Sequence, residues 1–170
     1  MHKPEPAAYE HYYRAYIELV DQEPILEKLE SLKNSTFKLL SNLTDEQANH
    51  AYAPGKWTVK QLAGHLIDAE RTFAYRAFAF SRGQAELPGF EENIYVERAN
   101  SNDRPIQDLA AELKTLREAN LYMLRAMTPQ QIETHGIANG HPIQVNTIVY
   151  QMAGHEVHHL NLLRDRYGIY

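Results

Sequence analysis

The chain contains no cysteine, and this absence narrows the chemistry that it can carry out. It excludes disulfide bonds, thiolate ligands for a metal and a cysteine nucleophile. A metal would therefore have to be bound by imidazole nitrogens and carboxylate oxygens. Any reaction that uses a thiol would need to take that thiol from another molecule.

The sequence also lacks a long apolar run and a basic stripe. No run approaches the roughly 20 residues of a membrane span, and the first residues, MHKPEPAAYE, lack the apolar centre of a signal peptide. The net charge of −5 argues against a nucleic-acid-binding surface. We therefore expect a soluble cytoplasmic protein with no membrane or nucleic-acid partner. Its 170 residues are expected to form a single domain over residues 1–170.

Apolar residues recur at the helical spacings of three and four, and no segment indicates a multi-stranded sheet. Thr58 and Gln61 form a capping box at the start of one helix, and Pro105 suits the first position of another. Four long helices are expected over residues 24–42, 58–81, 105–127 and 146–167. The pattern predicts an all-α protein with a four-helix bundle.

Three further segments accompany the predicted bundle. A stripe of Tyr9, Tyr13, Tyr16, Ile17 and Val20 predicts an extra N-terminal helical segment. Residues 83–104 are rich in glycine, proline and asparagine and predict a long loop between helices two and three. Loops of that length often cover functional sites, and Glu91, Glu92 and Tyr95 are candidates for this role unless they are simply solvated. The Asn139-Gly140 pair predicts a small hairpin.

A histidine-rich stretch near the end of the chain carries the main functional signal. His155, Glu156 and His159 spell H-E-x-x-H, the pattern of zinc proteases. Spacing of four places His155 and His159 on one helix face, where both can reach one ion at about 2.0–2.1 Å. His158 could replace His159 at spacing three. The protease interpretation fails, because only 11 residues follow His159 and none of them is histidine or glutamate.

A second segment repeats the context of His155. The stretches QLAGH, ending at His65, and QMAGH, ending at His155, share Gln-x-Ala-Gly-His ninety residues apart. Glycine inside a helix costs about 1 kcal/mol relative to alanine, so its position before both histidines needs a reason. We expect the Ala-Gly pairs to let the two helices pack closely and direct the imidazoles at one point, although a chance repeat is the alternative. His65, His155 and His159 are therefore predicted to hold a divalent metal with open coordination positions.

Two carboxylates are candidates for catalytic roles beside these histidines. Glu156 is either a general base, a partner that orients an imidazole, or an exposed carboxylate. Asp68 shares the face of His65 at spacing three. It could be a ligand, a partner of a ligand, or one member of a salt bridge on its own helix.

The segments YYRAYIELV, KWTVKQLAGHLIDAERTFAYRAFAFSRG, LPGFEENIYV and AGHEVHHLNLLRDRYG resemble the DinB/YfiT-like family of metal-dependent enzymes. The likeness is to its subgroup with a tyrosine-rich start and a His-x-x-His-His ending. Where that pattern leads us to expect an aspartate after Phe90, this sequence has Glu91.

The resemblance implies an up-down-down-up four-helix bundle that forms a homodimer. It also implies a nickel or zinc ion on His65, His155 and His159, and characterised members of the family include thiol-dependent S-transferases and a maleylpyruvate isomerase. Hydrolysis of a small molecule and transfer of a low-molecular-weight thiol to one are both compatible with an imidazole-bound divalent ion. The alternative is a metal-binding or stress-response module without catalysis.

Overall fold

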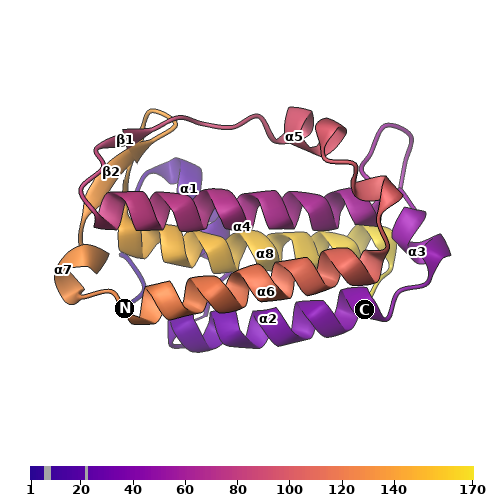
Figure 1. Cartoon of the computed structure of the whole chain (residues 1–170), viewed down its shortest axis with the longest axis horizontal. Helices are drawn as coiled ribbons and strands as arrows, with labels where there is room; N and C mark the ends of the chain where they lie inside the picture. Colours follow the sequence, from indigo (N-terminus) through magenta and orange to yellow (C-terminus); the bar gives the residue numbers. More distant parts are fainter. Residues whose placement is uncertain (6–8, 22) are drawn as a thin grey trace.

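The four predicted long helices are all present in the computed structural model, which describes residues 1–5, 9–21 and 23–170. Each of their ends lies within two residues of its predicted position. They lie side by side along the long axis of the molecule (Figure 1) and are α2 (Ile25–Ser41), α4 (Val59–Ser81), α6 (Ile106–Arg125) and α8 (Val145–Tyr167).

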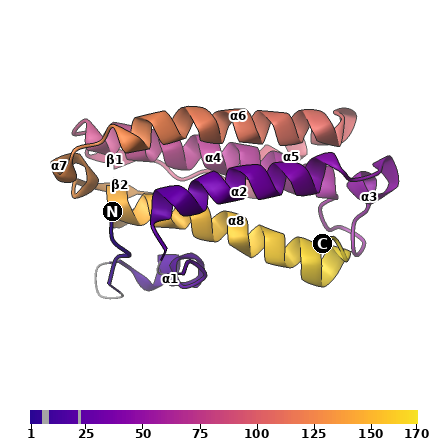
Figure 2. The ribbon, with the colours of Figure 1, turned by 90° about the horizontal axis from the view of Figure 1, so that it is seen from below.

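The directions of these helices follow the expected up-down-down-up path. Helices α2 and α8 run one way along the bundle, and α4 and α6 run the opposite way (Figures 1 and 2). Helix α4 packs against α6 and has 23 residues, which correspond to a length of about 34 Å. Because α4 and α6 point the same way, the chain must travel back along that whole length before α6 begins. This return explains the long connection over residues 83–104.

The connection contains short elements that its composition did not reveal. They are strand β1 (Glu86–Leu87), helix α5 (Glu92–Arg98) and a 3₁₀ turn, η2 (Ser101–Asp103). Helix α5 and the turn η2 both pack on α4, so the connection covers one side of that helix (Figure 1). Elements of two to seven residues are too short to show a clear periodicity in the sequence.

The predicted hairpin is present, and it belongs to a small sheet that was not predicted. Strands β2 (His135–Ala138) and β3 (His141–Gln144) pair antiparallel across a turn in which Asn139 and Gly140 have φ of 55° and 77°. Both values fit a tight hairpin turn that needs positive φ at two positions. Strand β1 adds to β2 in parallel, with Leu87 opposite Ala138.

Three short helices complete the fold. Helix α1 (His11–Ile17) packs against α8 and buries Tyr13 and Ile17, as the tyrosine-rich stripe predicted; the side chain of Tyr12 is outside the described part. Helices α3 (Asp45–Asn49) and α7 (Pro129–Ile132) each begin with a threonine–glutamine capping box. No helix in the described part of the chain is both long enough and apolar enough to cross a membrane.

The apolar core is divided in two along the bundle. One cluster includes Leu29 and Leu121, and the other includes Leu40 and Leu109. Between the two clusters, a buried polar side chain from each long helix forms a layer that lies beside the predicted histidines. These four residues, which we call the mid-bundle layer, are Thr36, Glu70, Arg117 and Glu156.

Candidate metal centre

The three predicted histidines converge on one point between α4 and α8. The Nε2 atom of His155 lies 3.0 Å from Nε2 of His65 and 3.2 Å from Nε2 of His159. Two imidazoles that bind one ion at about 2.0–2.1 Å, with an angle of about 90–110° between the bonds, have nitrogens about 2.8–3.4 Å apart. The observed distances match that range. Within the described residues, these three form a group whose ligand atoms all lie within 4.8 Å of one another.

Burial keeps the three imidazoles neutral. It lowers the pKa of His65 to about 4, although the nearby Glu92 carboxylate opposes this shift. Burial, followed by the charges of His65 and His158, lowers the pKa of His159 to about 3. The pKa of His155 is well below its usual value for the same first reason. Neutral imidazole is the form that binds a metal, so these three groups are in the ligand state at neutral pH.

Aromatic side chains hold the imidazole rings in place. The ring of Trp57 lies 4.9 Å from that of His65, while Tyr16 and Phe73 each lie 5.4 Å from His155. The Nδ1 atoms of His65 and His159 are buried without a hydrogen-bond partner among the described residues. Packing against Trp57, rather than a hydrogen bond to Nδ1, therefore orients the imidazole of His65.

The glycines of the repeated motif allow close contacts, but not the contact we expected. A Cβ atom at Gly154 would lie 2.0 Å from the backbone oxygen of Tyr16 in α1. A Cβ at Gly64 would lie 2.1 Å from Oγ of Ser101 in η2. The prediction that these glycines bring α4 and α8 together was therefore wrong. Instead, each glycine directly precedes a histidine and leaves room for a segment outside the bundle: α1 at Gly154 and η2 at Gly64.

The repeated glutamines also differ in their roles. Gln61 accepts a hydrogen bond from the backbone nitrogen of Thr58 and so caps α4. Gln151 is buried beside the histidines in α8 instead. The two repeated segments therefore place a histidine at the same point, but their glutamines make different contacts.

A cavity of about 170 Å³ opens beside the three histidines. Its walls come from α1, the segment before α4, α4 itself, the connection after α4, the end of β2 with its turn, and α8, and they combine aromatic and polar side chains. Besides the three histidines, the lining residues are Tyr13, Tyr16, Trp57, Phe73, Arg76, Phe90, Glu92, Ala138, Asn139, Gln151 and His158. This arrangement provides a partly open space, lined by both aromatic and polar groups, next to the three histidines.

Arg76 joins the cavity wall to the connection that covers it. Its Nη2 atom donates a hydrogen bond to the carbonyl of Pro88 at 3.0 Å, and the side chain is buried. Arg76 lies eleven residues after His65 in α4, which is three helical turns along the same face. Arg76 was not predicted from the sequence, although its spacing from His65 was the available signal.

Glu156 points away from the cavity, into the mid-bundle layer. Its Oε1 accepts a hydrogen bond from Oγ1 of Thr36 at 2.6 Å, and its Oε2 lies 2.8 Å from Nη2 of Arg117. The carboxylate does not line the 170 Å³ cavity. This geometry does not support the interpretation of Glu156 as a general base, since its contacts are with Thr36 and Arg117.

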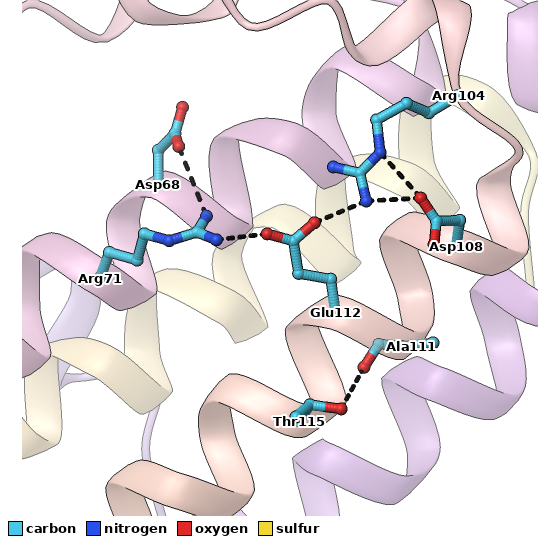
Figure 3. A network of polar contacts seen from close by, with 7 residues as sticks. All are labelled: Asp68, Arg71, Arg104, Asp108, Ala111, Glu112 and Thr115. Atoms are coloured by element: carbon cyan, nitrogen blue, oxygen red, sulfur yellow. Dashed lines mark hydrogen bonds and ion pairs between the residues drawn. The ribbon is translucent and has the colours of Figure 1, made fainter.

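Asp68 is not brought together with the histidines. Its Oδ1 lies 3.9 Å from Nη1 of Arg71, which also pairs with Glu112 in α6 (Figure 3). Arg104 extends this network by binding both Glu112 and Asp108. Of the three alternatives for Asp68, the structure therefore shows the ion pair on its own helix. Burial raises the pKa of Asp68, and Arg71 opposes that shift.

The other candidates divide between the cavity and the solvent. Glu92 and His158 line the cavity, and the His158 ring stacks edge-on against Tyr16 at 5.6 Å. Glu91 is exposed, and Tyr95 is 48% exposed while its ring lies 5.3 Å from that of Phe90. The connection therefore does cover the site, mainly through Phe90 and Glu92.

Several known proteins are similar to this chain. Proteins named "Putative metal-dependent hydrolase" from Oceanobacillus iheyensis and Geobacillus thermodenitrificans are 26% and 28% identical over 139 and 135 residues. These alignments cover 79% and 76% of this chain, and the same shares of the two relatives.

Solved structures show the same fold. The structure of YfiT from Bacillus subtilis, described as a probable metal-dependent hydrolase with an unusual four-helix bundle topology, gives a TM-score of 0.71 at 20% identity. The alignment covers 99% of this chain and 94% of YfiT. A DinB-like protein, YjoA, from the same organism gives 0.59 at 19% identity, covering 82% and 85% of the two chains. The family model of the DinB superfamily matches residues 28–163, so this chain belongs to the DinB superfamily.

Proposed function

We propose that this protein is a metal-dependent hydrolase of a small molecule and that His65, His155 and His159 hold its divalent ion. The observation that carries the proposal is the convergence of three neutral imidazoles at the wall of a cavity of about 170 Å³. Three imidazoles from two helices leave further coordination positions open, as catalytic sites require. Nickel and zinc both suit imidazole ligands.

A divalent ion at this site would supply Lewis acidity, which lowers the pKa of water or of a thiol and polarises an electrophile. The chain's own residues perform the remaining tasks. Trp57, Phe73 and Phe90 supply apolar walls that exclude water and hold the apolar part of a substrate. Among the lining side chains, His158 and Glu92 are the groups able to accept a proton from the attacking nucleophile.

Transfer of a low-molecular-weight thiol is the second candidate activity. The family resemblance implies it, and the absence of cysteine means that the thiol would be a separate co-substrate. A cytoplasmic location and a homodimer complete the proposal, and both rest on the sequence and the resemblance. Light scattering on the purified protein tests the dimer.

Untagged protein, stripped with a chelator and then reloaded with zinc or nickel, tests the activity. We expect hydrolysis of at least one ester, amide or phosphoester in a substrate panel, lost on stripping and restored by the metal. His155→Asn should abolish this activity, whereas His135→Asn, at an exposed position on β2, should not. Activity only with an added thiol would favour the transferase instead. Activity that survives both stripping and His155→Asn would contradict the proposal.

A further inference from the structure

The mid-bundle layer holds a charged triad deep inside the molecule. Arg117 binds Glu70 with two parallel hydrogen bonds, Nε to Oε1 at 2.9 Å and Nη2 to Oε2 at 2.8 Å. The same Nη2 lies 2.8 Å from Oε2 of Glu156. All three side chains are at most 4% exposed. One guanidinium therefore serves two carboxylates from two different helices.

Two further side chains donate hydrogen bonds to these carboxylates. Asn120 donates to Oε1 of Glu70 at 2.8 Å, and Thr36 donates to Oε1 of Glu156 at 2.6 Å. With two carboxylates and one guanidinium, the triad has a formal charge of −1.

A buried net charge is costly unless an opposite charge lies close to it. Two other cations are buried in the described part of the chain, Lys60 and Arg76. Lys60 donates to the carbonyl of Asn102 and Arg76 to that of Pro88, both in the connection between α4 and α6. The three histidines of the candidate metal centre are neutral. Among the described side chains, Arg117 is the cation that pairs with these carboxylates, so the triad as described carries an excess of negative charge.

The triad lies directly behind the candidate metal centre. Glu156 follows His155 in α8, and a small cavity of about 10 Å³ is lined by His155 together with Glu70, Arg117 and Glu156. A space of that size holds at most about one water molecule. Little or no solvent therefore separates the triad from His155, so its charge is weakly screened there.

We propose that the Glu70–Arg117–Glu156 triad is the charge partner of the metal centre and strengthens the binding of a divalent cation to the three neutral histidines. This inference rests on the proposed function only in that it takes His65, His155 and His159 as ligands. The triad does not bind the ion itself. It acts through its net charge, while Glu156 also connects the segment of α8 that carries His155 to α2 and α6.

Zinc affinity, measured by competition with a chromophoric chelator at fixed pH, tests the proposal. Glu70→Gln keeps the shape of the side chain but removes its charge, and we expect it to weaken zinc binding about 10- to 100-fold. Glu156→Gln should do the same. Glu70→Asp alters the shape but keeps the charge, and it should bind zinc within about threefold of the unmodified protein. Glu112→Gln, in the exposed network of Figure 3, is the matched control and should leave the affinity unchanged.

The outcomes separate a charge effect from a structural one. Melting curves recorded without metal rank the variants by stability. Zinc affinities are measured at 4 °C and calculated per folded protein, so that partial unfolding is not mistaken for weaker binding. Zinc affinity that follows this stability ranking instead of the charge, or a folded glutamine variant with unchanged affinity, would overturn the proposal. If the unmodified protein binds no zinc, the proposed function fails as well. If it binds zinc through His155 but both glutamine variants bind equally well, only the present inference fails.

Discussion

The absence of a side chain at Gly154 allows α1 to pack closely against α8 beside the metal centre. A Cβ there would meet the backbone oxygen of Tyr16 at 2.0 Å, and backbone cannot rotate away as a side chain can. We predict that Gly154→Ala lowers the free energy of unfolding by about 1–3 kcal/mol, the usual cost of overpacking, as measured by urea denaturation.

Gly64→Ala provides the contrast, because its obstacle is the Ser101 hydroxyl at 2.1 Å. Adding Ser101→Ala should recover part of the stability lost in Gly64→Ala. If Gly154→Ala were as stable as the unmodified protein, α1 would not pack on α8 as described.

The buried histidines predict a specific dependence of stability on pH. Burial lowers the pKa of His65 to about 4, and the pKa of His159 is lowered to about 3, both from 6.5. Below pH 6.5 the unfolded chain therefore binds protons that the folded chain does not. The metal-free protein should lose stability as the pH falls from 6.5 towards 4, by at most about 1.4 kcal/mol per pH unit for each histidine.

Urea denaturation at several pH values between 7 and 4 measures this slope. His65→Gln should reduce it, whereas the exposed His135 can be replaced by glutamine without such a change. Equal slopes for the unmodified protein and His65→Gln would show that His65 is not held neutral by burial.

Some residues of the site could be predicted from the sequence, and others could not. The pairing of His155 and His159, with His65 from a matching context, could be predicted because helical spacing and a repeated motif are local signals. Arg117 and Glu70 were missed. The buried stripe of α6 includes Leu113 and Leu121, and the helical period predicts an apolar residue at position 117 between them. The arginine found there was the available signal. Only the packing of four helices reveals that it pairs with Glu70 and Glu156.

Among the structural elements, the connection between α4 and α6 is held by contacts with other parts of the chain, namely β2 and α4. Strand β1 pairs with β2, and the backbone nitrogen of Asn139, directly after β2, donates a hydrogen bond to the carbonyl of Leu87 at 3.1 Å. Arg76 holds the next residue, Pro88. We predict that Arg76→Met loosens this segment, so that the amide of Asn139 exchanges its hydrogen faster by at least about tenfold, since a hydrogen bond to a charged group contributes about 1.5–3 kcal/mol.

Hydrogen exchange resolved by residue measures this effect. The amide of Val145, which donates to the carbonyl of Thr134 on the other side of the hairpin, is an internal control and should keep its rate. Faster exchange at both amides would indicate general destabilisation, and unchanged exchange at Asn139 would contradict the role of Arg76.

The elements that could be predicted are those with local signals. The Thr58–Gln61 capping box, Pro105 and the apolar periodicity located the long helices, and Asn139-Gly140 located the hairpin turn. Strand β1 has only two residues, and its partners Ile137 and Ala138 lie about fifty positions further along the chain. No local pattern encodes such a pairing, so the sheet became visible only in the folded structure.

At the scale of the whole molecule, two charged networks differ in burial and should differ in their effect on stability. Arg117 is 3% exposed and connects α6 with α4 and α8, whereas Arg71 is 49% exposed on the outside of the bundle. Arg117→Met leaves two buried carboxylates unpaired and should cost about 3–5 kcal/mol. Arg71→Met should cost about 1 kcal/mol or less, because solvent screens its ion pairs.

Thermal or urea denaturation of the two methionine variants compares these costs directly. Similar losses for Arg117→Met and Arg71→Met would mean that the buried triad is not a main connection between the helices.

The central claim is that three histidines from two helices form one metal site. Metal analysis of untagged protein, incubated with zinc or nickel and then freed of excess ion, tests it most directly. We predict about one divalent ion per chain in the unmodified protein and in His135→Asn, and almost none in His155→Asn, which loses the imidazole that contacts both other ligands. A metal content that is unchanged in His155→Asn, or negligible in the unmodified protein, would contradict the account.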